Sequence, residues 1–317
     1  MKTPDRADSA PPRTPGPPGR LRRFRLQWIG IAGSLLDIAR RQLIKLVALA
    51  FAGLSIAHAQ SGGYAFVGIA DWDRDRHQDI IARDASGVLW LYPGMSVRGY
   101  SQAQRVQIGN GWNGYAFAGI ADWDRDGHQD IVAKDVNGAL WLYPGASKRG
   151  YSPGERVEIG NGWAGYTFVG VTDWDRDGHQ DIIARDTSGV LWLYPGMSTR
   201  SYSSAQRVEI GNGWAGYVFA GLTDWDRDGH QDIIARDTSG VLWLYPGMSV
   251  RGYSPADRVQ IGNGWSTYVF SRLIGDWDRD GNKDILAKDA SGTLWLYPGA
   301  STRGYSQAQR VQIGNGW

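Results

Sequence analysis

The chain has 317 residues and no cysteine, and its 34 Lys and Arg against 32 Asp and Glu give a formal net charge of +2. The absence of cysteine excludes a disulfide framework, a thiolate metal site and a cysteine nucleophile. With 21% charged residues, the composition favours neither a disordered chain nor a strongly basic nucleic-acid-binding protein.

The charge is unevenly distributed along the chain. Residues 1–59 hold 10 Lys and Arg against 3 acids, which leaves 24 against 29, a net charge of −5, for residues 60–317. Because this body is acidic, we expect no nucleic-acid partner.

The first 59 residues have the features of an export signal. A basic cluster precedes an apolar stretch over residues 46–57, which is too short to span a bilayer comfortably. The stretch ends in Ala57-His58-Ala59, which places small residues where a signal peptidase requires them. We predict a cleaved signal over residues 1–59 and a short linker over 60–63, with an uncleaved membrane anchor as the alternative. After cleavage we expect a secreted protein, free or associated with the cell surface, without stable membrane insertion.

The basic cluster also indicates an export route. The order Arg40-Arg41-Gln42-Leu43-Ile44-Lys45 resembles a twin-arginine signal. That pattern usually has Ser or Thr before the arginines and Phe where Leu43 stands, so the route stays open.

Residues 64–317 consist of five copies of one repeat. The triplet Asp-Trp-Asp begins at residues 71, 122, 173, 224 and 276, so the spacing is 51 residues three times and 52 once. The extra residue lies within residues 271–275. A fixed period of this size indicates a solenoid or a propeller.

Each copy alternates short apolar runs with turn residues and lacks the helical 3.6-residue period. In the third copy we expect strands over residues 166–171, 181–185, 190–194 and 207–211. Their apolar residues stand at consecutive positions, which indicates a sheet covered on both faces, as the blades of a propeller are. The sequence therefore predicts an all-β fold, a five-bladed β-propeller built from five 51-residue four-stranded repeats. The alternative, an open stack, would need distinct capping repeats.

The loop between the first and second strands reads Asp-Trp-Asp-Arg-Asp-Gly-x-x-Asp. Its carboxylates at positions 1, 3, 5 and 9, with a backbone carbonyl at position 7, are ligands that suit calcium and not zinc. An EF-hand is excluded because strands flank the loop and, in the second copy, Ala133 stands where a bidentate Glu is needed. In the first copy Arg76 replaces the loop Gly, so we expect this site to be the weakest.

These loops hold 20 of the 29 acids in the body. We predict up to five calcium ions, with acidic surface turns solvated by water as the alternative. The predicted ligands, with His or Asn contributing its backbone carbonyl, are Asp71, Asp73, Asp75, His77 and Asp79; Asp122, Asp124, Asp126, His128 and Asp130; Asp173, Asp175, Asp177, His179 and Asp181; Asp224, Asp226, Asp228, His230 and Asp232; and Asp276, Asp278, Asp280, Asn282 and Asp284.

The loop followed by an Ile-rich strand and a Gly hairpin resembles the FG-GAP and VCBS repeats of integrin α-chain propellers and of many secreted bacterial proteins. The resemblance covers residues 64–317 and implies structural calcium and a role in adhesion or carbohydrate recognition. Integrin propellers have seven units where this chain has five. The segment from Ile159 to Phe168 is also similar to the repeats of the five-bladed tachylectin, which binds N-acetyl sugars.

Three classes of function remain open. A glycan-binding or adhesive module is favoured, with a carbohydrate or cell-surface glycoconjugate as partner, because aromatic faces beside amides hold sugars. If the junction tryptophans are exposed, they pair with tyrosines to form five repeated sites; if they are buried, they are blade packing. The candidate ligand-binding residues are Trp112, Tyr115, Trp163, Tyr166, Trp214, Tyr217, Trp265, Tyr268, Trp317 and Tyr64.

An enzyme is not expected, and a hydrolase-type enzyme is the least favoured alternative. Near-identical repeats offer no single asymmetric cleft, and the sequence contains no nucleophile elbow, P-loop or zincin helix. The histidines at loop position 7 are interpreted as solvent-facing, since the fifth copy has Asn282 there. The third class is a purely structural surface protein without a small ligand.

Overall fold

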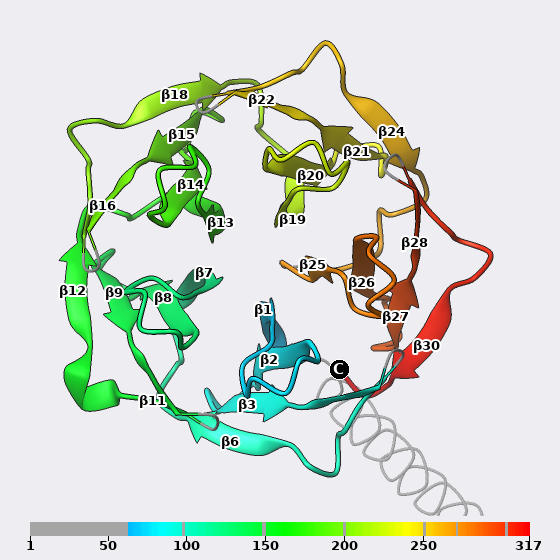
Figure 1. Cartoon of the computed structure of the whole chain (residues 1–317), viewed down its shortest axis with the longest axis horizontal. Helices are drawn as coiled ribbons and strands as arrows, with labels where there is room; N and C mark the ends of the chain where they lie inside the picture. The colour runs from blue at the N-terminus through cyan, green and yellow to red at the C-terminus, as the bar shows by residue number, and fades with distance from the viewer. Residues whose placement is uncertain are drawn as a thin grey trace, which may run out of the picture. The chain divides into compact units, whose positions relative to one another are not determined.

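The computed structural model describes residues 63–96, 99–147, 150–198, 201–249, 252–270, 272–301 and 304–317. The predicted export signal over residues 1–59 therefore lies outside the described residues. Within the described part, five four-stranded antiparallel sheets form a ring, which confirms the predicted five-bladed propeller (Figure 1). These residues form no α-helix; a short 3-10 helix, η1, spans Pro153–Glu155.

Each blade is an antiparallel meander formed by one repeat, with its inner strand at the ring axis and its outer strand at the rim (Figure 1). The inner strands are β1 (Ala65–Ala70), β7 (Ala116–Ala121), β13 (Thr167–Thr172), β19 (Val218–Thr223) and β25 (Ile274–Gly275). The second strands are β2 (Asp79–Arg83), β8 (Asp130–Lys134), β14 (Asp181–Arg185), β20 (Asp232–Arg236) and β26 (Asp284–Lys288). The third strands are β3 (Leu89–Tyr92), β9 (Leu140–Tyr143), β15 (Leu191–Tyr194), β21 (Leu242–Tyr245) and β27 (Leu294–Tyr297). The outer strands are β6 (Val106–Gly109), β12 (Val157–Gly160), β18 (Val208–Gly211), β24 (Val259–Gly262) and β30 (Val311–Gly314).

Short strand pairs between the third and outer strands were not anticipated from the sequence. They are β4 (Gly94–Ser96) with β5 (Gly99–Tyr100), β10 (Gly145–Ser147) with β11 (Gly150–Tyr151), β16 (Gly196–Ser198) with β17 (Ser201–Tyr202), β22 (Gly247–Ser249) with β23 (Gly252–Tyr253), and β28 (Gly299–Ser301) with β29 (Gly304–Tyr305). In the third blade, Pro195 follows β15 and Gly196 begins β16. The proline lacks an N–H, but the next glycine continues as a strand after the bend. The four main strands of the third blade lie within one residue of their predicted bounds.

The core lies between neighbouring blades. Ile182, Ile183 and Ala184 of β14 are all fully buried, although their side chains point to alternating faces of the sheet. Ile182 packs in a cluster shared with the second blade and Ile183 in one shared with the fourth. Consecutive apolar residues therefore mark a sheet sandwiched between two others.

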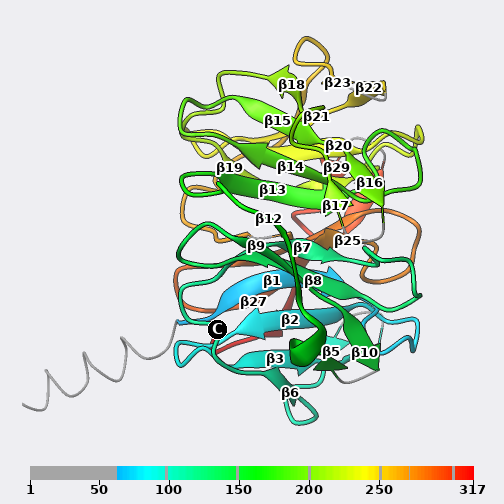
Figure 2. The same ribbon diagram turned by 90° about the vertical axis from the view of Figure 1, so that its left-hand side faces the viewer.

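The ring closes through contacts between the first and fifth blades. Phe66 and Ile80 of the first blade share a buried cluster with Leu286 and Trp317 of the fifth. The strands run along the ring axis, so the loops emerge at two opposite faces (Figure 2).

Candidate metal centres

The five aspartate loops leave the same end of the inner strands and therefore lie on one face of the ring. In the third blade the loop runs from Asp173, directly after β13, to Asp181, the first residue of β14. Pairing of Thr172 with Asp181 closes the loop at its base.

Aspartate side chains fold each loop onto itself. In the third loop, Asp175 Oδ1 accepts a hydrogen bond from the Asp177 N–H at 3.2 Å. Asp177 Oδ1 in turn accepts one from the His179 N–H at 2.7 Å, and Asp173 Oδ2 one from the Gly178 N–H at 3.0 Å. These are Asx-type turns, so the acidic residues shape the loop as well as charge it.

The loops turn through two residues in the left-handed backbone region. Gly178 at position 6 has a φ of 86°, and Arg176 at position 4 has a φ of 61°. Arg76, which replaces the glycine in the first blade, adopts the same region with a φ of 74°. The first loop therefore keeps the fold of the others but bears extra backbone strain.

The last aspartate of each loop is buried and tied to the backbone. Asp181 has no exposed surface, and its Oδ2 accepts hydrogen bonds from the N–H groups of Trp174 at 2.8 Å and Asp175 at 3.2 Å. Its Oδ1 accepts a third from the Gly196 N–H at 2.7 Å, which joins the loop to β16. Burial raises the pKa of Asp181 to about 7, although these three donors act in the opposite direction.

The other blades repeat this arrangement. Burial raises the pKa of Asp79 and Asp232 to about 7, and that of Asp130 and Asp284 to about 6. In the absence of a cation, each loop therefore holds one carboxyl group that resists ionisation.

Carboxylate oxygens converge in every loop. Three of them lie within 4.8 Å of one another in each of five clusters: Asp71, Asp73 and Asp79; Asp122, Asp124 and Asp130; Asp173, Asp175 and Asp177; Asp224, Asp226 and Asp228; Asp276, Asp278 and Asp284. Three of the four predicted aspartates thus come together in each loop, whereas the clusters do not include Asp75, Asp126, Asp181, Asp232 and Asp280. The backbone carbonyls at position 7 stay a prediction as fifth ligands.

One oxygen in each cluster lacks a hydrogen-bond donor. The Oδ1 atom of the first loop aspartate is buried without a partner in Asp71, Asp122, Asp173, Asp224 and Asp276. A buried carboxylate oxygen with no partner is unfavourable, and a cation at this point would supply the missing interaction. The residues present therefore fit a hard divalent cation with oxygen ligands, as calcium is.

The side chains at position 7 were predicted to face solvent, but they are partly covered. The His77 and His128 side chains are only 25% and 26% exposed, and each ring lies against the aspartate two residues before it. They also meet the position-4 arginine of the preceding blade: Arg74 contacts His128 Nε2 at 2.7 Å, Arg125 contacts His179, and Arg227 donates to Asn282 Oδ1 at 2.6 Å. Because Asn accepts as His does, this contact between blades survives the exchange.

The tryptophans proposed as exposed binding residues are buried, so that expectation is wrong. Trp112, Trp163, Trp214, Trp265 and Trp317 are each 2% exposed. Trp163 packs against the rings of Tyr166, Phe168 and Tyr194 at centroid distances of 4.6 to 5.3 Å. These residues are blade packing, the alternative that the sequence left open.

The same tryptophans join consecutive blades. Trp163 N–H donates to Gly138 O in the hairpin of the second blade at 3.0 Å, and its Nε1 donates to Tyr202 Oη in the third blade at 2.8 Å. Lys134, at the end of β8, donates to the carbonyls of Trp163 and Tyr166. Trp317 repeats this at the ring closure, where its Nε1 donates to Tyr100 Oη at 2.7 Å and its ring lies 5.2 Å from that of Tyr64.

The hairpin between the second and third strands of each blade begins with an aspartate. Asp186 Oδ1 accepts from the N–H groups of Ser188 and Val190, and Oδ2 accepts from Trp192 Nε1 at 2.9 Å. These donors hold the pKa of Asp186 below its usual value, against the effect of burial. In the sequence, the spacing Asp-x-x-Gly before a Trp-containing strand could have indicated this role.

The repeat matches a known family model. A family model described as an FG-GAP-like repeat matches residues 71–133, 122–184, 173–235 and 224–287. No curated protein matches the chain. Among solved structures, the crystal structure of Chaetomium thermophilum Raptor is similar over 79% of this chain and 21% of its own, with 11% identity and a TM-score of 0.40. The tachylectin resemblance stays a prediction.

In the part of the chain that the structure describes, no helix has the length and apolar character needed to cross a membrane. The family matches together span residues 71–287, more than half of the chain, and each begins at the first aspartate of a loop. With four consecutive matches and a ring of five blades, the chain belongs to the FG-GAP-like repeat family.

Proposed function

We propose that this protein is an exported, calcium-stabilised recognition module that binds the carbohydrate of glycoconjugates. The family supports the general class, because FG-GAP-like propellers are in general non-catalytic recognition or structural domains and are typical of extracellular proteins. The observation that carries the calcium part is the buried, unpartnered Oδ1 atom in all five loops. Each loop aspartate set would hold one ion and thereby fix the loop.

The burial of the tryptophans moves the proposed sugar-binding surface to the aspartate loops. In the first blade a hollow of about 480 Å³ lies beside the loop and is lined by Asp73, Asp75, Met95, Gln104 and Arg105. Carboxylate, amide and guanidinium groups suit sugar hydroxyls, and the Met95 side chain, which is 52% exposed, suits an apolar C–H face. The hollow thus combines the two chemistries that a sugar presents.

The exposed methionines vary between blades and so make the proposal specific. Met197 and Met248 hold the position of Met95 in the third and fourth blades and are 53% and 61% exposed. The second and fifth blades have Ala146 and Ala300 instead. We therefore expect three strong sites per chain in place of the five that equal repeats would give.

A glycan-array screen of the mature chain, with calcium and again with excess chelator, tests the function. For a glycan that is retained, titration calorimetry should give a stoichiometry near three. Met95→Ala should remove one site, whereas Val136→Ala, a matched loss of an exposed apolar side chain on a hairpin, should remove none.

The second candidate, a purely structural surface protein, makes the opposite prediction. It is favoured by the extent of buried aromatic packing at every blade junction. No retained glycan in either condition, together with a calcium-dependent melting temperature, would support it.

A further inference from the structure

The fifth blade departs from the repeat at the ring axis. Each of the five repeats has a phenylalanine near the start of its inner strand. Two residues after it, the other four blades have a glycine: Gly68, Gly119, Gly170 and Gly221. The fifth blade has Arg272 there, followed by one extra residue. Arg272 has a φ of 53°, in the left-handed region that favours glycine. The four glycines do not have a positive φ, so the backbone of the fifth blade takes a different course here. An arginine kept in a strained conformation points to a role for its side chain.

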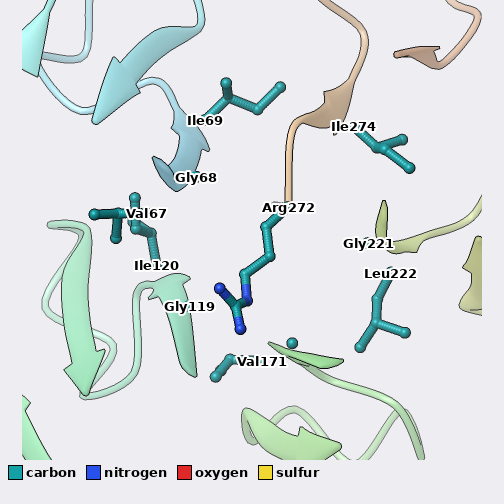
Figure 3. A pocket seen from close by; sticks show the side chains of 11 residues that line it. Val67, Gly68, Ile69, Gly119, Ile120, Val171, Gly221, Leu222, Arg272 and Ile274 are labelled. Atoms are coloured by element: carbon teal, nitrogen blue, oxygen red, sulfur yellow. The ribbon is translucent and has the colours of Figure 1, made fainter. Parts of the chain in front are cut away.

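The Arg272 side chain extends into a cavity on the axis. The cavity has a volume of about 100 Å³, and inner-strand residues of all five blades line it (Figure 3). Apart from Arg272, its lining consists of glycines and of aliphatic side chains such as Ile69, Ile120 and Leu222. The Arg272 guanidinium reaches across the ring, where Nη2 donates to Phe168 O of the third blade at 3.0 Å.

A second cavity meets the first at Arg272. It has a volume of about 270 Å³, and Phe168, Arg185, Tyr217 and Phe219 contribute to its lining. Arg185 is held in place because its Nη1 donates to Trp214 O and Tyr217 O at 2.8 Å each. Two guanidinium groups and three aromatic rings therefore surround one hollow, and neither lining includes an Asp or Glu among the described residues.

We propose that this axial hollow binds a small organic carboxylate, with the carboxylate at Arg272 and an apolar body against the aromatic rings between the third and fourth blades. A guanidinium is planar and matches a carboxylate in a bidentate contact. Burial lowers the pKa of Arg272 to about 10, so the group stays charged at neutral pH, and an anion beside it would stabilise that charge. The carboxylate can belong to a free acid or to the C-terminus of a peptide, and these sources share the same chemistry.

This proposal does not depend on the aspartate loops. The proposed site and the aspartate loops lie at opposite ends of the inner strands. The test uses the full chain in millimolar calcium and titrates phenylacetate by calorimetry, with phenylacetamide as the uncharged control. Two peptide probes, one ending in a free Phe carboxylate and one amidated, distinguish the sources. Binding of phenylacetate alone identifies a free acid, and tight binding of the free-ended peptide identifies a chain terminus.

Arg272→Gly restores the residue of the other four blades and should fold at least as well, because it removes the left-handed arginine. We expect it to bind phenylacetate about tenfold more weakly or not at all, since a charge-assisted contact is lost. Arg236→Gln, which changes the fourth-blade equivalent of Arg185, should bind as the wild type does. Equal affinity of wild type and Arg272→Gly overturns the proposal, as does equal binding of the charged and uncharged probes. Failure of every carboxylate to bind, with a lower melting temperature for Arg272→Gly, would make Arg272 a structural plug and would also overturn it.

Discussion

The two ends of each inner strand carry the most regular features of the repeat, yet their environments are opposite. At one end, the aspartate loop is a partly exposed turn with buried carboxylate oxygens at its centre. At the other end, the Trp-x-x-Tyr turn is enclosed by the neighbouring blade, with Trp163 only 2% exposed. Both segments are rich in glycine and polar residues in the sequence. The role of a repeated turn therefore depends on whether the neighbouring blade packs against it.

Removing calcium should have the largest effect on this comparison. Extracellular modules hold calcium at roughly 10⁻⁴ to 10⁻³ M, so millimolar calcium would contribute on the order of 1 kcal/mol per site and about five times that over the ring. We expect the melting temperature to fall markedly in excess chelator, measured by calorimetry. Identical melting curves in calcium and in chelator would leave the aspartate loops as solvated acidic turns.

Truncation of the buried tryptophan should have the second largest effect. Trp163→Ala should lower the free energy of unfolding by about 3 to 5 kcal/mol, because it empties a buried site between two blades. Trp163→Phe, which keeps a ring but loses the bond to Tyr202, should cost clearly less. Urea denaturation measures both. A loss near zero for the alanine variant would mean that the ring is not buried in solution.

Replacing the buried aspartate at the loop end should have the third largest effect. Asp181→Ala leaves three backbone N–H groups without an acceptor, and we expect a loss of about 3 kcal/mol even in chelator. Asp177→Ala, at an exposed position of the same loop, should change stability little in chelator but weaken calcium binding. Denaturation in both conditions separates a structural carboxylate from a ligand; equal behaviour of the two variants would contradict the distinction.

The next effect is a dependence of the free energy of unfolding on pH, spread over several pH units. Because the folded-state pKa of Asp181 is about 7 against a usual 3.8, the calcium-free fold binds more protons than the unfolded chain between these values. The free energy of unfolding in chelator should therefore fall as the pH rises from about 4 to about 7. Calcium needs ionised carboxylates, so its affinity should rise over the same range. Stability in chelator that increased with pH would show that these carboxyl groups ionise normally.

The smallest effect concerns the first loop. Arg76→Gly removes a left-handed arginine and should raise the free energy of unfolding by about 1 kcal/mol. The reverse exchange in the third loop, Gly178→Arg, should lower it by a similar amount. Thermal melts of the two variants measure both changes in stability, and the two changes must have opposite signs.

Much of the site could be predicted from the sequence because its information is local. The aspartates at positions 1, 3, 5 and 9 lie within one loop of nine residues, and turn chemistry brings three of their oxygens together in each blade. The consecutive apolar residues of the second and third strands likewise fixed the strands and required two covered faces.

What only the tertiary structure decided depends on contacts between blades. Whether Trp163 faced solvent or a neighbour was set by Gly138 and Tyr202, which come from the segments before and after it in the ring. The position-7 histidines gained their arginine contacts from the preceding blade. The sequence places an extra residue within residues 271–275, but the position of Arg272 on the axis depends on all five inner strands meeting there. The sequence by itself determined the period, the strands and the calcium-type loops, since these are local patterns; burial and the axial cavity arise only when the ring closes.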